Sequence, residues 1–202
     1  MGRKHKQKHK IEQFSDINLF DCEFLGKGHN GIVYLLPSNK VIKVCFVMKD
    51  FHGEASILKK VDGNKYFPRI YEVGGNYMIR DYVDGMPLKD YIKINGINKQ
   101  LCCDIIDMLK EFQRLKFTKI DVRCKDIFVT ASRKLMIIDP QKFYSKDRDF
   151  PRHLSKGLFK LGVLDIFLDI LHAEEPFLYK KWINKIQNYI MFLESERGED
   201  DD

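Results

Sequence analysis

The stretch Gly26-Lys27-Gly28-His29-Asn30-Gly31-Ile32-Val33 decides the fold, together with Val41-Ile42-Lys43 on the next predicted strand. Glycines at this spacing let a backbone hairpin close tightly over an anion, and a lysine on the following strand can meet phosphate groups from the side. Three glycines in a polar turn also occur in ordinary hairpins. Residues further along the chain therefore decide between a lid over a nucleotide and a plain hairpin.

The residues around this stretch predict a small antiparallel sheet. Strand-prone side chains favour two strands within residues 20–36, a third over 41–47, and a hairpin of strands 69–73 and 77–83. A helix is expected over residues 51–61, where Ala55 and Leu58 share the buried side. Five strands and one helix therefore precede residue 84.

The chain changes character after Asp84-Gly85-Met86-Pro87, where we place the boundary between two lobes. Apolar residues at helical spacing predict helices over residues 101–115, 158–171 and 176–194. Two short strands are expected at residues 127–130 and 135–138. The second lobe is therefore expected to be mainly helical.

The net charge of +6 is distributed unevenly. Five Lys or Arg residues lie within residues 3–10, and the chain ends in Glu199-Asp200-Asp201-Asp202. We expect residues 1–10 to form a mobile basic arm and residues 196–202 an acidic tail. Such an arm is either simply solvated or contacts an acidic partner or a nucleic acid.

Cysteine usage and hydropathy bear on the cellular compartment in which the protein is found. Five cysteines without a Cys-x-x-Cys pair argue against a disulfide framework and a structural zinc site. No apolar run approaches the roughly 20 residues that span a bilayer, and the first ten residues lack the apolar core of a secretory signal. We therefore expect a cytoplasmic protein with reduced thiols and no transmembrane segment.

Lys43 lies in an apolar predicted strand, where an unpaired ammonium group costs free energy. Glu54, on the following predicted helix, is the nearest acidic side chain with a suitable direction. A lysine held in this way presents its charge to phosphate oxygens. The alternative is a lysine at the edge of a strand, whose ammonium group reaches water.

A second group of charged residues begins at Asp121 and continues through Arg123 and Asp126 to Asp139. Asp139 ends an apolar strand, where a carboxylate can hold a metal ion, and Asp126 would supply a second oxygen ligand for magnesium. Asp121 would then orient a hydroxyl nucleophile and accept its proton. Alternatively, Asp121 and Asp126 only cap a turn and Asp139 opens a loop.

These motifs, in this order, resemble the protein-kinase superfamily, in the compact form of small bacterial and archaeal serine/threonine kinases. The resemblance covers about residues 20–172. It implies an α+β, two-lobed fold. Residues 11–84 would form an N-terminal lobe with a five-stranded antiparallel sheet and one helix, and residues 85–195 a reduced, mainly helical C-terminal lobe.

The resemblance also implies a site for ATP and Mg²⁺, with Mn²⁺ as an alternative metal. The residues that match the nucleotide-binding positions are Gly26, Lys27, Gly28, Gly31, Val33, Lys43, Glu54, Asp81, Val83 and Asp84. Among them, Asp81 and Val83 would meet adenine through their backbones and Asp84 would reach the ribose. Asp121 matches the catalytic aspartate and Arg123 the basic residue that neutralises the transferred phosphate, whereas Asp126 and Asp139 match the metal ligands.

The chain departs from the family pattern at several positions. Asp126 stands where the family usually has Asn, Lys119-Ile120-Asp121 lacks the usual His and Arg, and Asp139-Pro140-Gln141 replaces Asp-Phe-Gly. No Ala-Pro-Glu motif follows, so the platform that docks peptide substrates is expected to be reduced or missing. These departures affect regulation and docking more than phosphate chemistry.

The function expected from this pattern is ATP-dependent phosphoryl transfer to a hydroxyl, with serine or threonine of a protein, including the chain itself, as the acceptor. One alternative is a small-molecule kinase that acts on a sugar-type acceptor. The other is a nucleotide-binding pseudokinase that acts as a regulatory module.

Overall fold

The structure, a computed structural model, describes residues 17–140, 142–144 and 146–198. The predicted basic arm at residues 1–10 and residues 199–202 of the predicted acidic tail lie outside this range. The chain forms two compact units. The first unit contains the described residues up to His52 together with Ile70–Tyr82, and the second contains Gly53–Arg69 and the chain from Val83 onward.

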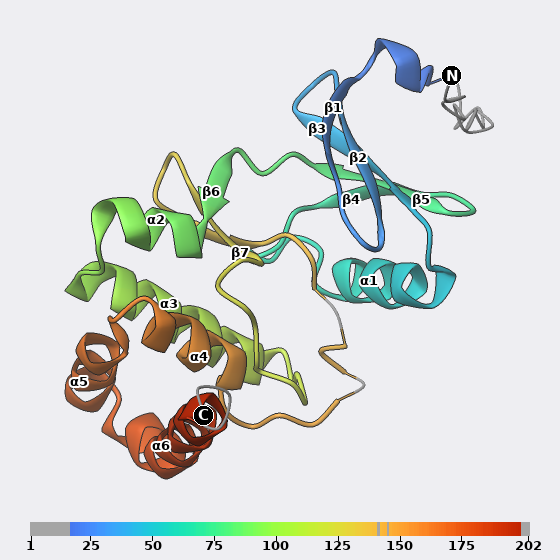
Figure 1. The fold of residues 1–202 in the computed structure, drawn as a ribbon. Helices are drawn as coiled ribbons and strands as arrows, with labels where there is room; N and C mark the ends of the chain where they lie inside the picture. Colours follow the sequence, from blue (N-terminus) through green and yellow to red (C-terminus); the bar gives the residue numbers. More distant parts are fainter. Residues whose placement is uncertain (1–16, 141, 145, 199–202) are drawn as a thin grey trace, which may run out of the picture. The chain divides into compact units, whose positions relative to one another are not determined.

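The first unit is built on an antiparallel sheet in the order β1-β2-β3-β5-β4 (Figure 1). Its strands are β1 (Glu23–Lys27), β2 (Gly31–Leu36), β3 (Lys40–Cys45), β4 (Ile70–Val73) and β5 (Tyr77–Asp81). A short 3-10 helix, η1 (Leu19–Asp21), precedes them. The five strands predicted before residue 84 are confirmed, although the third ends at Cys45 and the last at Asp81.

The centre of this sheet is β3, which pairs with β2 on one side and β5 on the other. Ile42 lies opposite Tyr34 on β2 and opposite Ile79 on β5. Ile42 and Ile79 belong to a buried cluster with Leu36 and Tyr77. These residues form the core on one face of the sheet, because alternate side chains of a strand share a face.

Helix α1 (Met48–Lys60) follows β3 and carries residues of both units, because the boundary between the units falls after His52. It confirms the helix predicted over residues 51–61 and begins a few residues earlier. Ala55 and Leu58 are buried, as their spacing predicted.

The second unit combines a three-stranded antiparallel sheet, in the order β6-β7-β8, with helices. Its elements are β6 (Gly85–Pro87), α2 (Leu88–Asn95), α3 (Lys99–Arg114), β7 (Ile127–Thr130), β8 (Leu135–Ile137), α4 (Arg152–Lys160), α5 (Leu164–Glu174) and α6 (Pro176–Gly198). Over the described residues the fold is thus α+β, with a five-stranded antiparallel sheet and six α-helices. This composition is compatible with a kinase-like fold.

Two elements of the second unit, β6 and α2, were not predicted. Strand β6 has three residues and forms only because its backbone pairs with β7. A Cβ atom at Gly85 would lie 2.5 Å from the carbonyl oxygen of Val129, so this close pairing requires glycine. Helix α2 has eight residues and ends at Gly96, whose φ of 71° lies in the left-handed region.

The single helix predicted over residues 158–171 is wrong, because two helices occupy this stretch. Gly162 has a φ of 70° and donates its N–H to the carbonyl of Phe159, while Val163 donates to the carbonyl of Leu158. These two bonds form a Schellman motif, which ends α4 before α5 begins. The leucine repeat continues across the break, which explains why periodicity alone joined the two helices.

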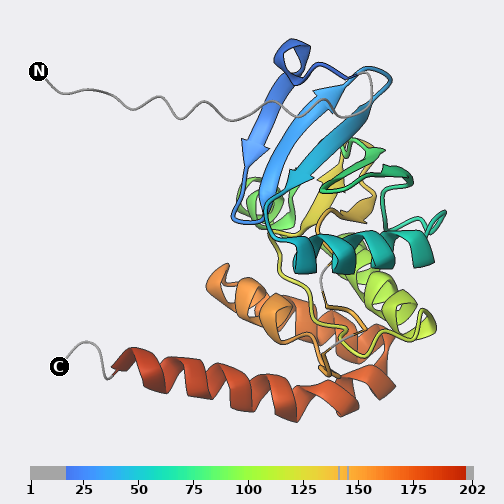
Figure 2. The ribbon, with the colours of Figure 1, turned by 90° about the vertical axis from the view of Figure 1, so that its right-hand side faces the viewer.

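The core of the second unit contains a group of phenylalanine rings, Phe67, Phe112, Phe117 and Phe143, whose centroids lie between 4.7 and 6.4 Å apart. The last helix, α6, packs against α4 and α5 (Figure 2). On α6, the buried Trp182 donates its indole N–H to the carbonyl of Asp149 at 2.9 Å. Among the described residues, no helix combines the length and apolar character needed to cross a membrane.

Replacing Gly162 by alanine should lower the free energy of unfolding by about 1–2 kcal/mol, because a side chain disfavours the left-handed region. Gly53→Ala is a matched variant for which the change in the free energy of unfolding should have the opposite sign. Gly53 lies inside α1 with no described atom within 4 Å of a Cβ at that position, so alanine should raise stability by about 0.5–1 kcal/mol. Urea denaturation measures both. A Gly162→Ala variant as stable as the wild type would contradict the role of the glycine stop.

Candidate active site

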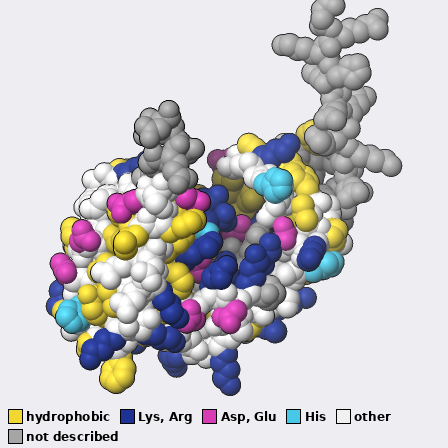
Figure 3. All heavy atoms as spheres, turned by 60° about the horizontal axis from the view of Figure 1, so that its bottom comes forward, with side chains coloured by type: hydrophobic (Ala, Val, Ile, Leu, Met, Phe, Trp, Pro, Cys, Tyr) yellow, Lys and Arg dark blue, Asp and Glu magenta, His cyan; other side chains and the backbone are white. Residues whose placement is uncertain are grey.

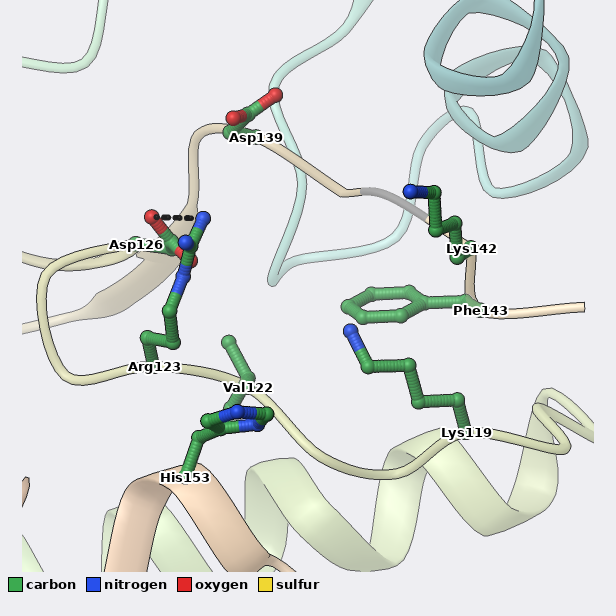
Figure 4. A pocket seen from close by; sticks show the side chains of 8 residues that line it. All are labelled: Lys119, Val122, Arg123, Asp126, Asp139, Lys142, Phe143 and His153. Carbon is green, nitrogen blue, oxygen red and sulfur yellow. Dashed lines mark hydrogen bonds and ion pairs between the residues drawn. The ribbon is translucent and has the colours of Figure 1, made fainter. Parts of the chain in front are cut away.

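A pocket of about 180 Å³ lies within the second unit. Figure 4 shows the eight side chains that line it: Lys119, Val122, Arg123, Asp126, Asp139, Lys142, Phe143 and His153. Three residues predicted from the sequence, Arg123, Asp126 and Asp139, are therefore brought together.

The two carboxylates of this pocket come from segments that flank the β7–β8 hairpin. Asp126 immediately precedes β7, and its N–H donates to the carbonyl of Arg123 at 2.9 Å, which closes a turn. The carbonyl of Asp126 in turn accepts the N–H of Ile138, next to Asp139, at 3.2 Å. The backbone of one hairpin thus sets the positions of both carboxylates.

Arg123 and Asp126 form a two-pronged ion pair. Arg123 donates from Nε to one carboxylate oxygen of Asp126 at 2.6 Å and from Nη2 to the other at 3.3 Å. Burial nevertheless raises the pKa of Asp126 above its usual value, and the nearby charge of Asp139 adds to this, while Arg123 opposes it. The pocket therefore holds two carboxylates whose negative charges disfavour each other.

Asp126 and Asp139 fit a magnesium ion that also binds phosphates. Mg²⁺ is commonly held by one or two carboxylates together with substrate phosphates and water. A divalent cation would offset the repulsion between the two carboxylates. Over the described residues, no cluster of three or more His, Cys, Asp or Glu side chains could hold a metal by itself. The metal would thus depend on a ligand that supplies further oxygens.

Asp121, the predicted catalytic aspartate, is completely buried and is held by His153. One carboxylate oxygen of Asp121 accepts the backbone N–H of His153 at 2.6 Å, and the other contacts His153 Nδ1. Pro151, at the N-cap position of α4, has no side-chain hydrogen bond to the helix. Asp121 therefore supplies the capping oxygen from a distant part of the chain.

The neighbouring Arg152 determines which nitrogen of His153 carries a proton. Arg152 Nη2 lies 3.2 Å from Nε2 of His153, and a guanidinium group only donates hydrogen bonds. Nε2 is therefore the acceptor, and Nδ1 carries the proton that is donated to Asp121. No local sequence signal pointed to His153, because it lies 32 residues from Asp121.

Lys119 and Phe143 are further pocket residues that the predicted site did not include. The Lys119 ammonium group lies 5.5 Å from the centroid of the Phe143 ring, and the two residues are also joined by a backbone hydrogen bond of 3.1 Å. Lys119 was noticed only as a departure from the family pattern. That departure was the sequence signal for a lysine two residues before Asp121.

The predicted glycine loop lies in the first unit as the hairpin between β1 and β2. Its turn closes through a hydrogen bond of 2.9 Å from the Gly28 N–H to the Gly31 carbonyl. A Cβ at Gly31 would lie 2.3 Å from the carbonyl oxygen of Val44, so Gly31 is needed for strand pairing. At Gly26 and Gly28, no described atom lies within 4 Å of such a Cβ, which leaves space over the hairpin.

Other residues predicted to bind the nucleotide lie on the strands of this hairpin and on the neighbouring strand. Lys27 pairs with Ile32 at the end of β1, and its ammonium group lies 5.7 Å from the Phe46 ring centroid. Val33 lies on β2, directly opposite Lys43 on β3. The hairpin and the lysine strand are thus adjacent in the sheet.

Lys43 itself lies on the central strand and is only 8% exposed. The alternative of a lysine at a strand edge is therefore wrong. Lys43 shares its face of β3 with the buried Val41 and Cys45. Glu54 is buried on α1, so both members of the predicted pair carry charges away from water.

The predicted hinge spans the boundary between the units, which falls between Tyr82 and Val83. Asp81 ends β5, where its carboxylate accepts the hydroxyl of Tyr71 at 2.8 Å and its carbonyl accepts the Arg80 side chain at 3.1 Å. Val83 is buried and Asp84 is exposed.

A comparison with known proteins found a distant similarity. A protein of Bacillus subtilis (strain 168) named "Putative serine/threonine-protein kinase YrzF" is 23% identical over 199 residues, which cover 91% of this chain and 89% of that protein. No family model matches the chain. The similarity supports a kinase-like family.

Asp126→Asn should increase stability at pH 7 when measured with EDTA. Because the pKa of Asp126 is raised in the folded state, the folded chain keeps this proton to higher pH than the unfolded chain. Stability therefore falls as pH rises through this range, and the ionised carboxylate opposes folding at pH 7. The gain from Asp126→Asn should shrink as the pH falls toward 3.8, the usual pKa of aspartate.

Urea titrations at pH 7 and pH 4 measure this difference. Asp169→Asn, at an exposed position on α5, is the control and should stay within about 0.5 kcal/mol of the wild type at both pH values. Equal stability of the wild type and Asp126→Asn at pH 7 would show that Arg123 fully compensates the buried charge.

His153→Ala should expose Asp121 to a water-soluble carbodiimide and an amine, whereas His153→Asn should keep it protected. The side-chain N–H of asparagine can take the place of Nδ1–H as a donor to the carboxylate. Mass spectrometry of the peptide that contains Asp121 measures how much amine has been attached, with Asp169 as the internal reference. Equal modification of Asp121 in the wild type and in His153→Ala would contradict the covering role of His153.

Proposed function

We propose that this protein is an ATP-dependent phosphotransferase that moves the γ-phosphoryl group of ATP to a hydroxyl. The observation that carries the proposal is the pocket that contains Arg123, Asp126 and Asp139, next to the His153–Asp121 pair. The kinase-named relative supports the same reaction class. Its name makes serine or threonine of a protein, including the chain itself, the first candidate acceptor.

On the nucleotide side, the proposed roles follow the sequence pattern. The glycine hairpin would cover the phosphates, with Gly26 and Gly28 leaving space for them. Lys43 would pair with phosphate oxygens and Glu54 would orient it. The backbones of Asp81 and Val83 would meet adenine, and Asp84 would meet the ribose.

Asp126 and Asp139 would hold Mg²⁺, or Mn²⁺ as the alternative. When bound, the metal neutralises phosphate charge and aligns the phosphoryl group. Arg123 would approach the transferred group while it keeps Asp126 in place through the ion pair. Each oxygen of Asp126 retains a lone pair beyond its bond to Arg123, so ion pairing and metal binding are compatible.

In the transfer step, the acceptor oxygen forms a bond to the γ-phosphorus. The bond from that phosphorus to the bridging oxygen breaks, and ADP leaves with the electron pair. The hydroxyl proton goes to a carboxylate oxygen of Asp121. Because Asp121 is completely buried beneath His153, we propose that the His153 side chain moves aside before the acceptor reaches it.

A small-molecule kinase is the second candidate function. A pocket of about 180 Å³ is smaller than the roughly 300–1,000 Å³ typical of sites for drug-sized ligands. This size favours a small hydroxyl compound or a single side chain. The burial of Asp121, in contrast, favours a nucleotide-binding module without transfer, which is the third candidate. The nucleic-acid contact predicted for residues 1–10 has no support in the described residues and is not part of the proposal.

Incubation of the protein with labelled ATP and Mg²⁺ or Mn²⁺ tests the proposal. Asp121→Asn should lower phosphoryl transfer by about 10²–10⁴-fold, as expected when a general base is lost. Asp139→Asn should raise the metal concentration needed for activity. Asp169→Asn is the control and should behave like the wild type.

Because Asp121 also caps α4, each variant requires a melting curve to show that it is folded. ATP binding by calorimetry without any transfer to protein or small hydroxyl compounds would favour the nucleotide-binding module. Undiminished transfer by a folded Asp121→Asn variant would remove the proposed mechanism.

A further inference from the structure

The position of Lys119 is fixed by several hydrogen bonds. The hydroxyl of the preceding Thr118 donates to the carbonyl of Lys146 at 2.7 Å and lies 3.2 Å from that of Phe143. On the other side, Ile120 donates its N–H to the carbonyl of Arg148 at 3.0 Å. Backbone bonds on both sides therefore direct Lys119 into the pocket.

Phe143 forms a rigid wall beside the Lys119 side chain. It is 2% exposed and packs within the phenylalanine group of the second unit, including Phe117, whose centroid is 4.7 Å away. Its ring faces the Lys119 ammonium group. A cation above a fixed aromatic ring has restricted freedom, so less entropy is lost when it binds a ligand.

Figure 4 separates the charges of the pocket into two sides. Asp126 and Asp139 lie on one side, together with Arg123. Lys119 and Lys142 lie beside Phe143 on the other side. The proposed metal and nucleotide phosphates belong to the carboxylate side, and the lysine side presents positive charge to a second ligand.

Burial disfavours the charge of Lys119 more than the nearby carboxylates favour it. Burial lowers the pKa of Lys119, and Arg123 and Lys146 add to this, while Asp121 and Asp126 oppose it. A bound anion would offset the burial and the neighbouring positive charges. Figure 3 shows lysine and arginine side chains interspersed with acidic side chains over the described residues, so positive charge is not confined to residues 1–10.

We infer that Lys119 and Lys142 bind a carboxylate or phosphate group of the phosphate acceptor, so that the acceptor is an anionic hydroxyl compound. The inference rests on the proposed phosphotransferase function and names its substrate class. Lys119 lies two residues before Asp121, and the pocket that it lines also contains His153, which covers the proposed base. The pocket of about 180 Å³ has room for such a group.

Protection of Lys119 from acetylation tests the inference without requiring transfer. The full chain is treated with limiting acetic anhydride, and acetylation is measured at Lys119 and at the exposed Lys134. The ligands are matched pairs: D-glycerate and glycerol, gluconate and glucose, and peptides with serine followed by Glu or Gln. Each is added with and without Mg-ADP.

We expect an anionic member of at least one pair to reduce acetylation of Lys119 about threefold or more, with no change at Lys134. Its neutral partner should give no protection. The pairs distinguish a small hydroxy acid from an acidic peptide as the source of the anion. Equal protection by neutral partners, or no protection by any compound, would overturn the inference. Full protection by Mg-ADP alone, with no effect of the acids, would assign Lys119 to the nucleotide instead.

Steady-state kinetics supply a second test with the acceptor that gives the best protection. Lys119→Gln should raise the KM for this acceptor about tenfold or more and leave the KM for ATP unchanged. Lys119→Arg should retain most of the affinity because it keeps the charge, and Lys134→Gln is the matched control. If the KM for ATP rises instead, the inference is wrong even though the phosphotransferase proposal stands. If ATP is not consumed at all while protection persists, the proposed function fails and the anion site remains.

Discussion

The hydrogen bonds between Asp121 and His153 hold the candidate active site together. A carboxylate with no exposed surface must be hydrogen-bonded, since a buried unpaired charge is strongly destabilising. His153 meets this need with its backbone N–H and its ring N–H. The same contact ties the start of α4 to the loop that continues through Arg123 and Asp126 into β7. The position of this loop therefore depends on where α4 begins.

Electrostatics divides the pocket into regions with different ligand preferences. Asp126 and Asp139 disfavour each other's charge, so this side gains from a divalent cation. Lys119 is half-buried, and burial lowers its pKa, so its side gains from an anion. Arg123 acts on both sides of the pocket. It forms an ion pair with Asp126, and its positive charge lowers the pKa of Lys119. The transfer of one phosphoryl group from a metal-bound polyphosphate to an anionic hydroxyl compound, with release of the shortened polyphosphate, would use both sides.

Local patterns predicted much of the fold. The five strands of the first unit followed from strand-prone residues and turns, and α1 and α3 followed from apolar spacing. Helix α2 and strand β6 escaped prediction because each is short and β6 exists only through pairing with β7. The two helices α4 and α5 were merged because leucines continue in phase across Gly162, while a left-handed backbone conformation ends the first helix.

The sequence by itself determined which chemical groups are present and in what order: a lysine in an apolar strand, and the series Asp121, Arg123, Asp126 and Asp139. The tertiary structure alone decided which groups meet them. It places His153 in hydrogen-bonding contact with Asp121, although the two are 32 residues apart in the sequence. It also places the Lys119 ammonium group over the Phe143 ring. The physical reason is that tertiary packing determines which hydrogen-bonding or charged group lies next to a buried charge. That partner lies close in space without any regular spacing along the chain.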